Sequence, residues 1–346
     1  MLIQSITDSP RDGYPLHVTA KRYWIPEFEA NTSDPNALTL ILLHSTSFHK
    51  ETWEPTIERI FALSVQPGSS VKIREAWSLD CPNHGVSGRL NEKQLMLPEF
   101  QNNFTCEKYA RAVHHFLSGG PKHDARVDFR RRRLVGIGHS LGGNAMLILQ
   151  HLEPIFTFSS IIIVEPLISP AGPQHLDKLR SILVKGAYER RDVWSNHTTA
   201  MKSLRSRERT KKWDPRITDL FVNYAVKPHP GSYCKEAPYH GVTLACSRDQ
   251  EAAMYRDADG PTQPVADLNK ACAAGYVHLV IGAINDFIPA RVHAAILDPD
   301  SGRKYLSVTK LSDVGHLVPQ EAPDRLGIAI YEALTKDEAR MSRSKL

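Results

Sequence analysis

The feature that most constrains the fold is a glycine-flanked serine turn between a hydrophobic segment and a run of small residues. Residues 132–137 have the pattern of a buried strand, the turn Gly138-His139-Ser140-Leu141-Gly142 follows, and 143–152 have the pattern of a helix. Glycines are required where a strand turns sharply into a helix, because a Cβ atom would clash there. The turn therefore predicts a sheet in which Ser140 projects above the strand ends.

Strand and helix patterns alternate along most of the chain, which predicts an α/β fold with a mostly parallel sheet flanked by helices. The expected strands are 16–25, 37–44, 71–79, 132–137, 159–164, 275–281 and 305–311, and the expected helices include 104–117, 143–152 and 323–334. No comparable strand pattern lies between 166 and 274, a stretch too long for one loop. We therefore expect a core formed by 1–166 and 275–346, with an inserted, mostly helical cap at 167–274.

Ser140 is the candidate nucleophile, and its hydroxyl needs a general base to react near neutral pH. His316 follows the last predicted strand and precedes the last predicted helix. A loop at that place can reach back to the serine turn, so His316 is the candidate base. The Leu141 N–H at the start of the helix is one candidate oxyanion donor, and the Thr46 N–H in the loop after 37–44 is the second. Ser45 and Ser47 stand in that loop, where glycines are often found.

Two carboxylates compete as the group that orients the histidine. Glu165 ends the predicted strand 159–164, directly after the nucleophile helix. Asp286 follows the predicted strand 275–281, but the usual position of an acid in that loop falls on Asn285. Either carboxylate could fix the histidine tautomer and stabilise the imidazolium. The sequence favours Glu165 and leaves Asp286 open.

Composition excludes several classes of protein. Hydrophobic residues make up 41% of the 346 positions, enough for a large core, and the net charge of +5 comes without a nucleic-acid-binding motif. The sequence contains no apolar stretch of about 18 residues, the length that a membrane span requires. The five cysteines are odd in number and widely spaced, which indicates free thiols. We expect no cofactor and no metal.

The last three residues are Ser344, Lys345 and Leu346. As a free carboxyl end, this tripeptide is the address read by the peroxisomal import receptor. The polar segment 336–343 before it is expected to be frayed, leaving the tail accessible. The sequence thus predicts a peroxisomal protein.

Four segments together resemble the α/β-hydrolase superfamily over nearly the whole chain: 44–55, 80–88, 138–143 and 315–321. Residues 48–53, 164–166 and 190–194, with the Ser-Lys-Leu end, resemble a narrower group of fungal peroxisomal hydrolases. This group includes toxin-biosynthesis hydrolases, an acyl-CoA hydrolase of the mycophenolic acid pathway and a yeast peroxisomal lipase. In that acyl-CoA hydrolase the acid follows the strand after the nucleophile, a place that maps onto Glu165, although the residue there is Asp.

The resemblance implies a serine hydrolase that cleaves an ester or acyl-CoA thioester through an acyl-Ser140 intermediate, in a peroxisomal step of secondary metabolism. Basic residues of the expected cap could attract the CoA phosphates. They are Lys178, Arg180, Lys185, Arg190, Arg191, Lys202, Arg205, Arg207 and Arg209. Two alternatives stay open: a receptor-like protein that binds its ligand with vestigial catalysis, and an acyltransferase that uses the same residues.

Overall fold

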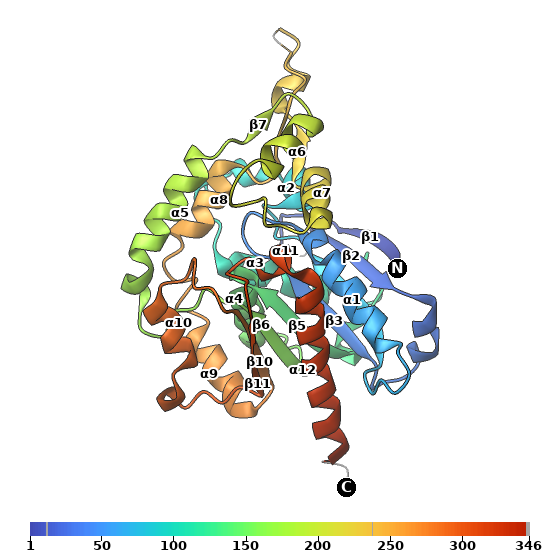
Figure 1. Cartoon of the computed structure of the whole chain (residues 1–346). Coiled ribbons are helices and arrows are strands. Elements are labelled where there is room, and N and C mark those ends of the chain that lie inside the picture. The colour runs from blue at the N-terminus through green and yellow to red at the C-terminus, as the bar shows by residue number, and fades with distance from the viewer. Residues whose placement is uncertain (12, 237, 344–346) are drawn as a thin grey trace.

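The computed structural model describes residues 1–11, 13–236 and 238–343. Its centre is an eight-stranded sheet in the order β1-β2-β4-β3-β5-β6-β10-β11 (Figure 1). The strands are β1 (Leu2–Asp8), β2 (Val18–Trp24), β3 (Leu38–Leu43), β4 (Ile73–Leu79), β5 (Arg133–His139), β6 (Phe158–Val164), β10 (Val277–Gly282) and β11 (Ser307–Leu311). The strands β4, β3, β5, β6, β10 and β11 run parallel to one another. At one edge of the sheet, β2 pairs antiparallel with β4 and β1 pairs antiparallel with β2. The predicted α/β fold with a mostly parallel sheet is confirmed.

The edge strand β1 was not predicted from the sequence. Most of its side chains are exposed, so it lacks the apolar run that marks the buried strands. It pairs with β2 over its whole length, from Leu2 opposite Trp24 to Asp8 opposite Val18. Backbone pairing, rather than burial, therefore accounts for this strand.

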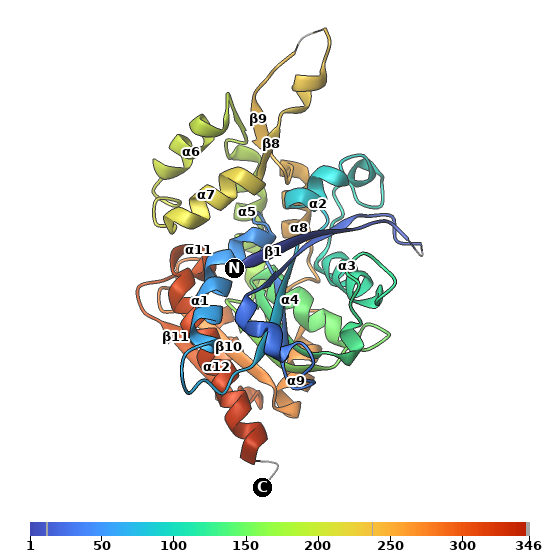
Figure 2. The same ribbon diagram turned by 90° about the vertical axis from the view of Figure 1, so that its right-hand side faces the viewer.

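Helices cover both faces of the sheet (Figure 2). On one face, α3 (Cys106–Ser118), α4 (Leu141–Ile148) and α10 (Ala290–Leu297) pack in the larger hydrophobic cluster. On the other face, α1 (Glu54–Ser64) and α12 (Pro323–Arg343) form a second cluster. Short helices α2 (Gly85–Leu90) and α11 (Val318–Glu321) lie in the loops that follow β4 and β11. Because both faces are buried, the central strands are continuously apolar.

The segment expected to form the cap contains helices and a small antiparallel sheet in the order β7-β9-β8. Its elements are α5 (Asp177–Glu189), β7 (Val193–Trp194), α6 (His197–Arg205), α7 (Pro215–Tyr224), β8 (Val226–Pro228), β9 (Val242–Leu244), α8 (Arg248–Arg256) and α9 (Val265–Ala274). Residues of α6, α7 and the small sheet share a hydrophobic cluster of their own. Helix α9 instead contributes Leu268, Ala271 and Cys272 to the cluster of the main sheet. The expected boundaries of the cap stay a prediction.

The final helix is longer than the sequence predicted. Residues 336–343, predicted to be frayed, continue α12 to Arg343. Asp337 explains part of this extension, because it is buried and its Oδ1 lies 3.1 Å from the His278 ring on β10. The end of the helix extends below the rest of the molecule in Figure 1. The predicted targeting residues Ser344, Lys345 and Leu346 lie outside the described residues.

Two further expectations concern the chain as a whole. All five cysteines are free thiols, as predicted. Within 1–11, 13–236 and 238–343, none of the helices combines the length and the apolar character needed to cross a membrane.

Candidate active site

The serine turn joins β5 to α4 in a strained backbone conformation. Ser140 has φ 53° and ψ −123°, and its N–H donates to the Val164 carbonyl at 2.9 Å. Side chains on the flanking glycines would not fit. A Cβ on Gly138 would lie 2.5 Å from the Gly142 oxygen, and one on Gly142 would lie 2.4 Å from the Leu43 oxygen. These contacts explain why the turn requires glycine on both sides of the serine.

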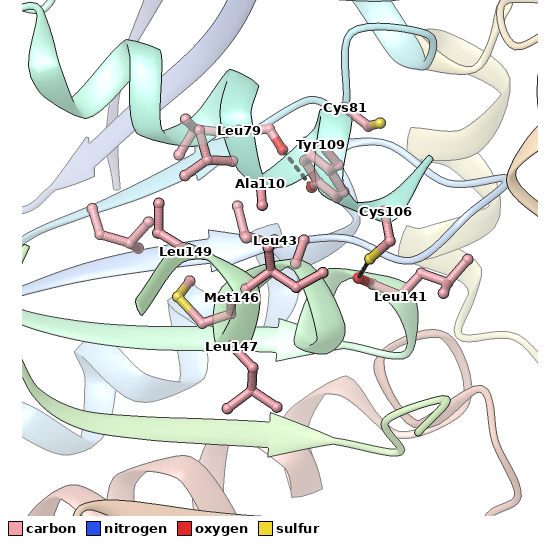
Figure 3. Packing of buried hydrophobic residues seen from close by; sticks show 14 of the residues in the cluster. Leu43, Leu79, Cys81, Cys106, Tyr109, Ala110, Leu141, Met146, Leu147 and Leu149 are labelled. Carbon is pink, nitrogen blue, oxygen red and sulfur yellow. Dashed lines mark hydrogen bonds between the residues drawn. The ribbon is translucent and has the colours of Figure 1, made fainter. Parts of the chain in front are cut away.

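Helix α3 contacts the first residue of α4 and the end of β4. Cys106 of α3 donates its Sγ–H to the Leu141 carbonyl at 3.4 Å, and Tyr109 donates its hydroxyl to the Leu79 carbonyl at 3.3 Å (Figure 3). Burial raises the pKa of the Cys106 thiol well above its ordinary value, so this thiol stays protonated and inert. Cys106 thus links α3 to the residue that follows Ser140.

Ser140, His316 and Glu165 form a continuous hydrogen-bonded chain of buried side chains. His316 Nε2 lies 3.1 Å from Ser140 Oγ, and His316 Nδ1 lies 3.2 Å from Glu165 Oε2. A carboxylate accepts hydrogen bonds, so the proton of the neutral imidazole belongs on Nδ1, and Nε2 is free to accept the serine proton. The arrangement has the geometry of a nucleophile, its general base and the orienting acid.

Glu165 is held from three sides at the carboxyl end of β6. Its Oε1 accepts the Gly282 N–H at 2.7 Å and lies 3.4 Å from His293 Nε2 of α10. Burial acts to raise the pKa of Glu165, but the neighbouring His293 and His316 outweigh it and lower the pKa to about 2. The carboxylate is therefore ionised at neutral pH.

Asp286 contacts the same histidine at a different atom. Its Oδ1 accepts the His316 backbone N–H at 2.9 Å. The carboxylate occupies the space beside Gly315, where a Cβ would lie 2.2 Å from Asp286 Oδ2. Asp286 thus fixes the loop that carries the histidine, whereas Glu165 contacts the ring.

Two neighbours of His316 were not predicted from the sequence. The Phe287 ring stacks on the imidazole, with 4.2 Å between centroids and 15° between planes. His139 Nε2 donates to the His316 carbonyl at 2.9 Å. Burial, with a contribution from His316, lowers the pKa of His139 to about 3, so this ring stays neutral. Each residue is adjacent in sequence to a predicted one, but no sequence pattern shows where its ring points.

The two candidate oxyanion donors belong to residues that line one cavity together with Ser140. Leu141 is the first residue of α4, and Thr46 lies in the loop after β3. Both border the same cavity as Ser140 and His316. In the part of the chain that the structure describes, neither backbone N–H has a protein acceptor within hydrogen-bond distance. Both donors are therefore available to a ligand.

A cavity of about 300 Å³ lies between the serine turn and the expected cap. Most of its wall is apolar, and it includes Leu183, Trp194, Trp213 and Phe221. Four of the basic residues noted in the sequence also border it: Arg190, Arg191, Arg207 and Arg209. The cavity can therefore hold an apolar group beside Ser140 and an anionic group beside the arginines.

No cluster of three or more His, Cys, Asp or Glu residues suited to a metal ion occurs among the described positions.

Known proteins similar to this chain agree with its architecture. The type I acyl-CoA thioesterase mpaH of Penicillium roqueforti (strain FM164) is 25% identical over 314 residues, which is 88% of this chain and 61% of that protein. The abhydrolase domain-containing protein AFT2-1 of Alternaria alternata is 26% identical over 230 residues, which is 59% of this chain and 84% of that protein. The chain spans between 45% and 61% of the length of the thioesterases that it matches.

The crystal structure of the peroxisomal alpha-beta-hydrolase Lpx1 from Saccharomyces cerevisiae is similar in fold. It superposes with a TM-score of 0.70 at 21% identity, over 96% of this chain and 89% of that one. The family model described as the alpha/beta hydrolase family matches residues 40–327. These matches confirm the predicted resemblance and, at the level of the family, the expectation of a hydrolase. The chain belongs to the alpha/beta hydrolase family.

Proposed function

We propose that the protein is a serine hydrolase that cleaves an ester or an acyl-CoA thioester. The observation that carries the proposal is the chain of contacts from Ser140 through His316 to Glu165, with distances of 3.1 and 3.2 Å. The free N–H groups of Leu141 and Thr46, two residues that border the same cavity as Ser140, add to it. Nucleophile, base, acid and oxyanion donors are the parts that acyl transfer needs.

In the proposed reaction, Ser140 Oγ attacks the acyl carbon while His316 Nε2 takes the hydroxyl proton. The carbonyl oxygen becomes an oxyanion and accepts hydrogen bonds from the Leu141 and Thr46 N–H groups. Glu165 stabilises the imidazolium formed at this stage. The tetrahedral intermediate then collapses, and His316 returns the proton to the leaving alcohol or thiol.

Water completes the cycle by the same steps. His316 removes a proton from water as it attacks the acyl carbon, and the carboxylic acid leaves when the proton returns to Ser140 Oγ. An acyltransferase would use the same acyl-enzyme with another nucleophile in place of water. Product analysis separates the two: a free acid as the sole acyl product supports hydrolysis.

The cavity supports a substrate with an apolar acyl group and an anionic carrier. Its wall beside Ser140 is mainly apolar, and four arginines border it. A thioester of CoA has this character, because its phosphates are anionic, and the relatives named type I acyl-CoA thioesterases favour the same substrate class. The arginine role is tested with Arg207→Gln. This variant should raise KM for an acyl-CoA several-fold and leave KM for an uncharged ester unchanged.

The nucleophile is tested with an activated ester and a fluorophosphonate probe. Wild-type protein should release product with an initial burst and should be labelled covalently at Ser140. Ser140→Ala should abolish both. If this variant retains full turnover, Ser140 is not the nucleophile. A protein that binds ligand while Ser140 stays unlabelled would instead support the receptor-like alternative.

We also propose a peroxisomal location and a step in fungal secondary metabolism. The Ser-Lys-Leu sequence and the similarity in fold to a yeast peroxisomal hydrolase support the location. The Penicillium and Alternaria relatives support the biological setting. A fluorescent protein fused before Met1 should enter peroxisomes when the chain ends at Leu346, and should stay in the cytosol when Ser344, Lys345 and Leu346 are deleted.

A further inference from the structure

The loop that carries Thr46 contains a residue in a conformation that favours glycine. Ser47 has φ 74°, a left-handed value that side chains other than glycine rarely adopt. The loop follows β3 and borders the cavity beside Ser140. A non-glycine residue persists in such a conformation only where the surrounding structure holds it. The contacts of Ser47 show what holds it.

The backbone of Ser47 is bound by a neutral histidine. Its N–H donates to His84 Nε2 at 2.9 Å, and the other ring nitrogen of His84 lies 2.6 Å from Asn83 Oδ1. Burial, with a contribution from His44, lowers the pKa of His84 well below its ordinary value. The unprotonated Nε2 therefore stays available to accept the Ser47 N–H.

The side chain of Ser47 is bound by helix α8 of the inserted segment. Ser47 donates its hydroxyl to Glu251 Oε1, and its Oγ lies 3.1 Å from the Tyr255 hydroxyl. Glu251 is buried, and its other oxygen lies 2.5 Å from Arg190, which follows α5. Glycine at position 47 would relieve the backbone but would lose this attachment. The hydroxyl gives a physical reason for serine at this position.

The same helix also contacts the neighbouring residue. Thr46 donates its hydroxyl to Met254 Sδ at 3.8 Å, one turn along α8 from Glu251. The loop is therefore fixed at Thr46 and at Ser47, while the Thr46 N–H remains without a protein acceptor among the described residues. The two contacts therefore restrain the backbone that carries this N–H, in a loop that borders the same cavity as Ser140.

We propose that Ser47, Glu251 and Tyr255 form a clamp through which α8 positions the Thr46 N–H for the oxyanion. These three are positioning residues, since none of them takes a proton or an acyl group. The inference rests on the proposed function in that it presumes an oxyanion at this site. Arg190 and Glu251 also border the cavity. A ligand that fills the cavity therefore lies against the clamp.

The clamp is tested by steady-state kinetics with an activated ester. Ser47→Ala and Glu251→Ala should each lower kcat roughly 10- to 100-fold with KM within about twofold, because a misplaced oxyanion donor affects mainly the transition state. Glu251→Gln should recover much of the loss, since its amide oxygen can still accept the Ser47 hydroxyl. Asp249→Asn, an exposed carboxylate on the same helix, is the matched control and should behave as wild type.

Ser47→Gly separates positioning from folding. Glycine removes the backbone strain, so this variant should fold at least as well as wild type and still lose kcat. The double variant Ser47→Ala with Glu251→Ala should lose about as much kcat as the more damaging of the two single variants, because both substitutions break the same Ser47–Glu251 contact. Wild-type kcat in Ser47→Gly, or fully additive losses in the double variant, would overturn the clamp.

Failure of the clamp is distinguishable from failure of the proposed function. If wild-type protein turns over the ester and is labelled at Ser140, but the clamp variants keep wild-type kcat, only the clamp is overturned. If wild-type protein is neither labelled nor active towards esters and acyl-CoA, both proposals are overturned.

Discussion

Two loops at the carboxyl end of the sheet each bring a carboxylate to His316, and the two carboxylates contact different parts of this residue. Glu165, at the end of β6, lies 3.2 Å from Nδ1 of the ring. Asp286, in the loop after β10, accepts the backbone N–H of the same residue at 2.9 Å. A contact to the ring can respond to its protonation, whereas a contact to the backbone can only fix its place. The comparison indicates that the atom contacted, and not the position in the chain, decides which carboxylate can act as the acid.

Replacing the ring contact should have the largest effect. Glu165→Gln should lower kcat about 10³- to 10⁴-fold, because an amide cannot stabilise the imidazolium and can favour the wrong tautomer. Turnover of an activated ester measures this loss. Asp286→Asn serves as the comparison and should lose far less. Equal small losses in the two variants would show that neither residue is the acid.

The ionisation of Glu165 should also appear in stability. Its folded pKa is about 2, below the value of 4.5 for an unperturbed glutamate. The unfolded chain therefore takes up the proton first as the pH falls. The stabilisation is complete above about pH 5, is lost as the pH falls from there towards 2, and is on the order of 3 kcal/mol.

Urea unfolding of wild type and Glu165→Gln between pH 2 and pH 7 measures this stabilisation. The difference in free energy of unfolding between them should be constant above pH 5 and shrink below it. A difference that does not change with pH would mean that Glu165 is not held in its ionised form by its neighbours.

Loss of the backbone contact should have a smaller effect. Asp286→Ala should lower kcat about tenfold, because the His316 N–H loses its acceptor and the loop loosens. Asp286→Asn should stay within about threefold of wild type, since its amide oxygen can still accept that N–H. Ester turnover and thermal unfolding of both variants test this. A loss of 10³-fold in Asp286→Asn would reverse the roles of the two carboxylates.

The stacked ring beside His316 should have the smallest effect. Phe287→Leu should lower kcat about two- to threefold, because a leucine fills part of the space but does not stack on the imidazole. Phe287→Tyr keeps the ring and should match wild type. If Phe287→Leu were as damaging as Glu165→Gln, the orientation of His316 would depend on stacking more than on its carboxylate.

Local patterns in the sequence were sufficient for much of the fold and for three of the candidate site residues. The apolar runs and the glycines around Ser140 describe a strand, a turn and a helix within a few residues of one another. His316 follows from its place after the last strand. Leu141 follows from the start of the helix, because the free N–H groups of a helix always lie in its first turn. Each of these inferences uses neighbours along the chain.

Contacts between distant segments were decided by the tertiary structure. The order β5-β6-β10 places Glu165 beside Gly282, 117 positions away, and so brings its carboxylate to the ring while Asp286 meets the backbone. Ser47 and Glu251, 204 positions apart, meet because α8 lies over the loop after β3. The sequence by itself determined the serine turn, since its geometry is local. Only the fold decided which carboxylate reaches the histidine ring and what holds the loop after β3, because both depend on how separate elements pack.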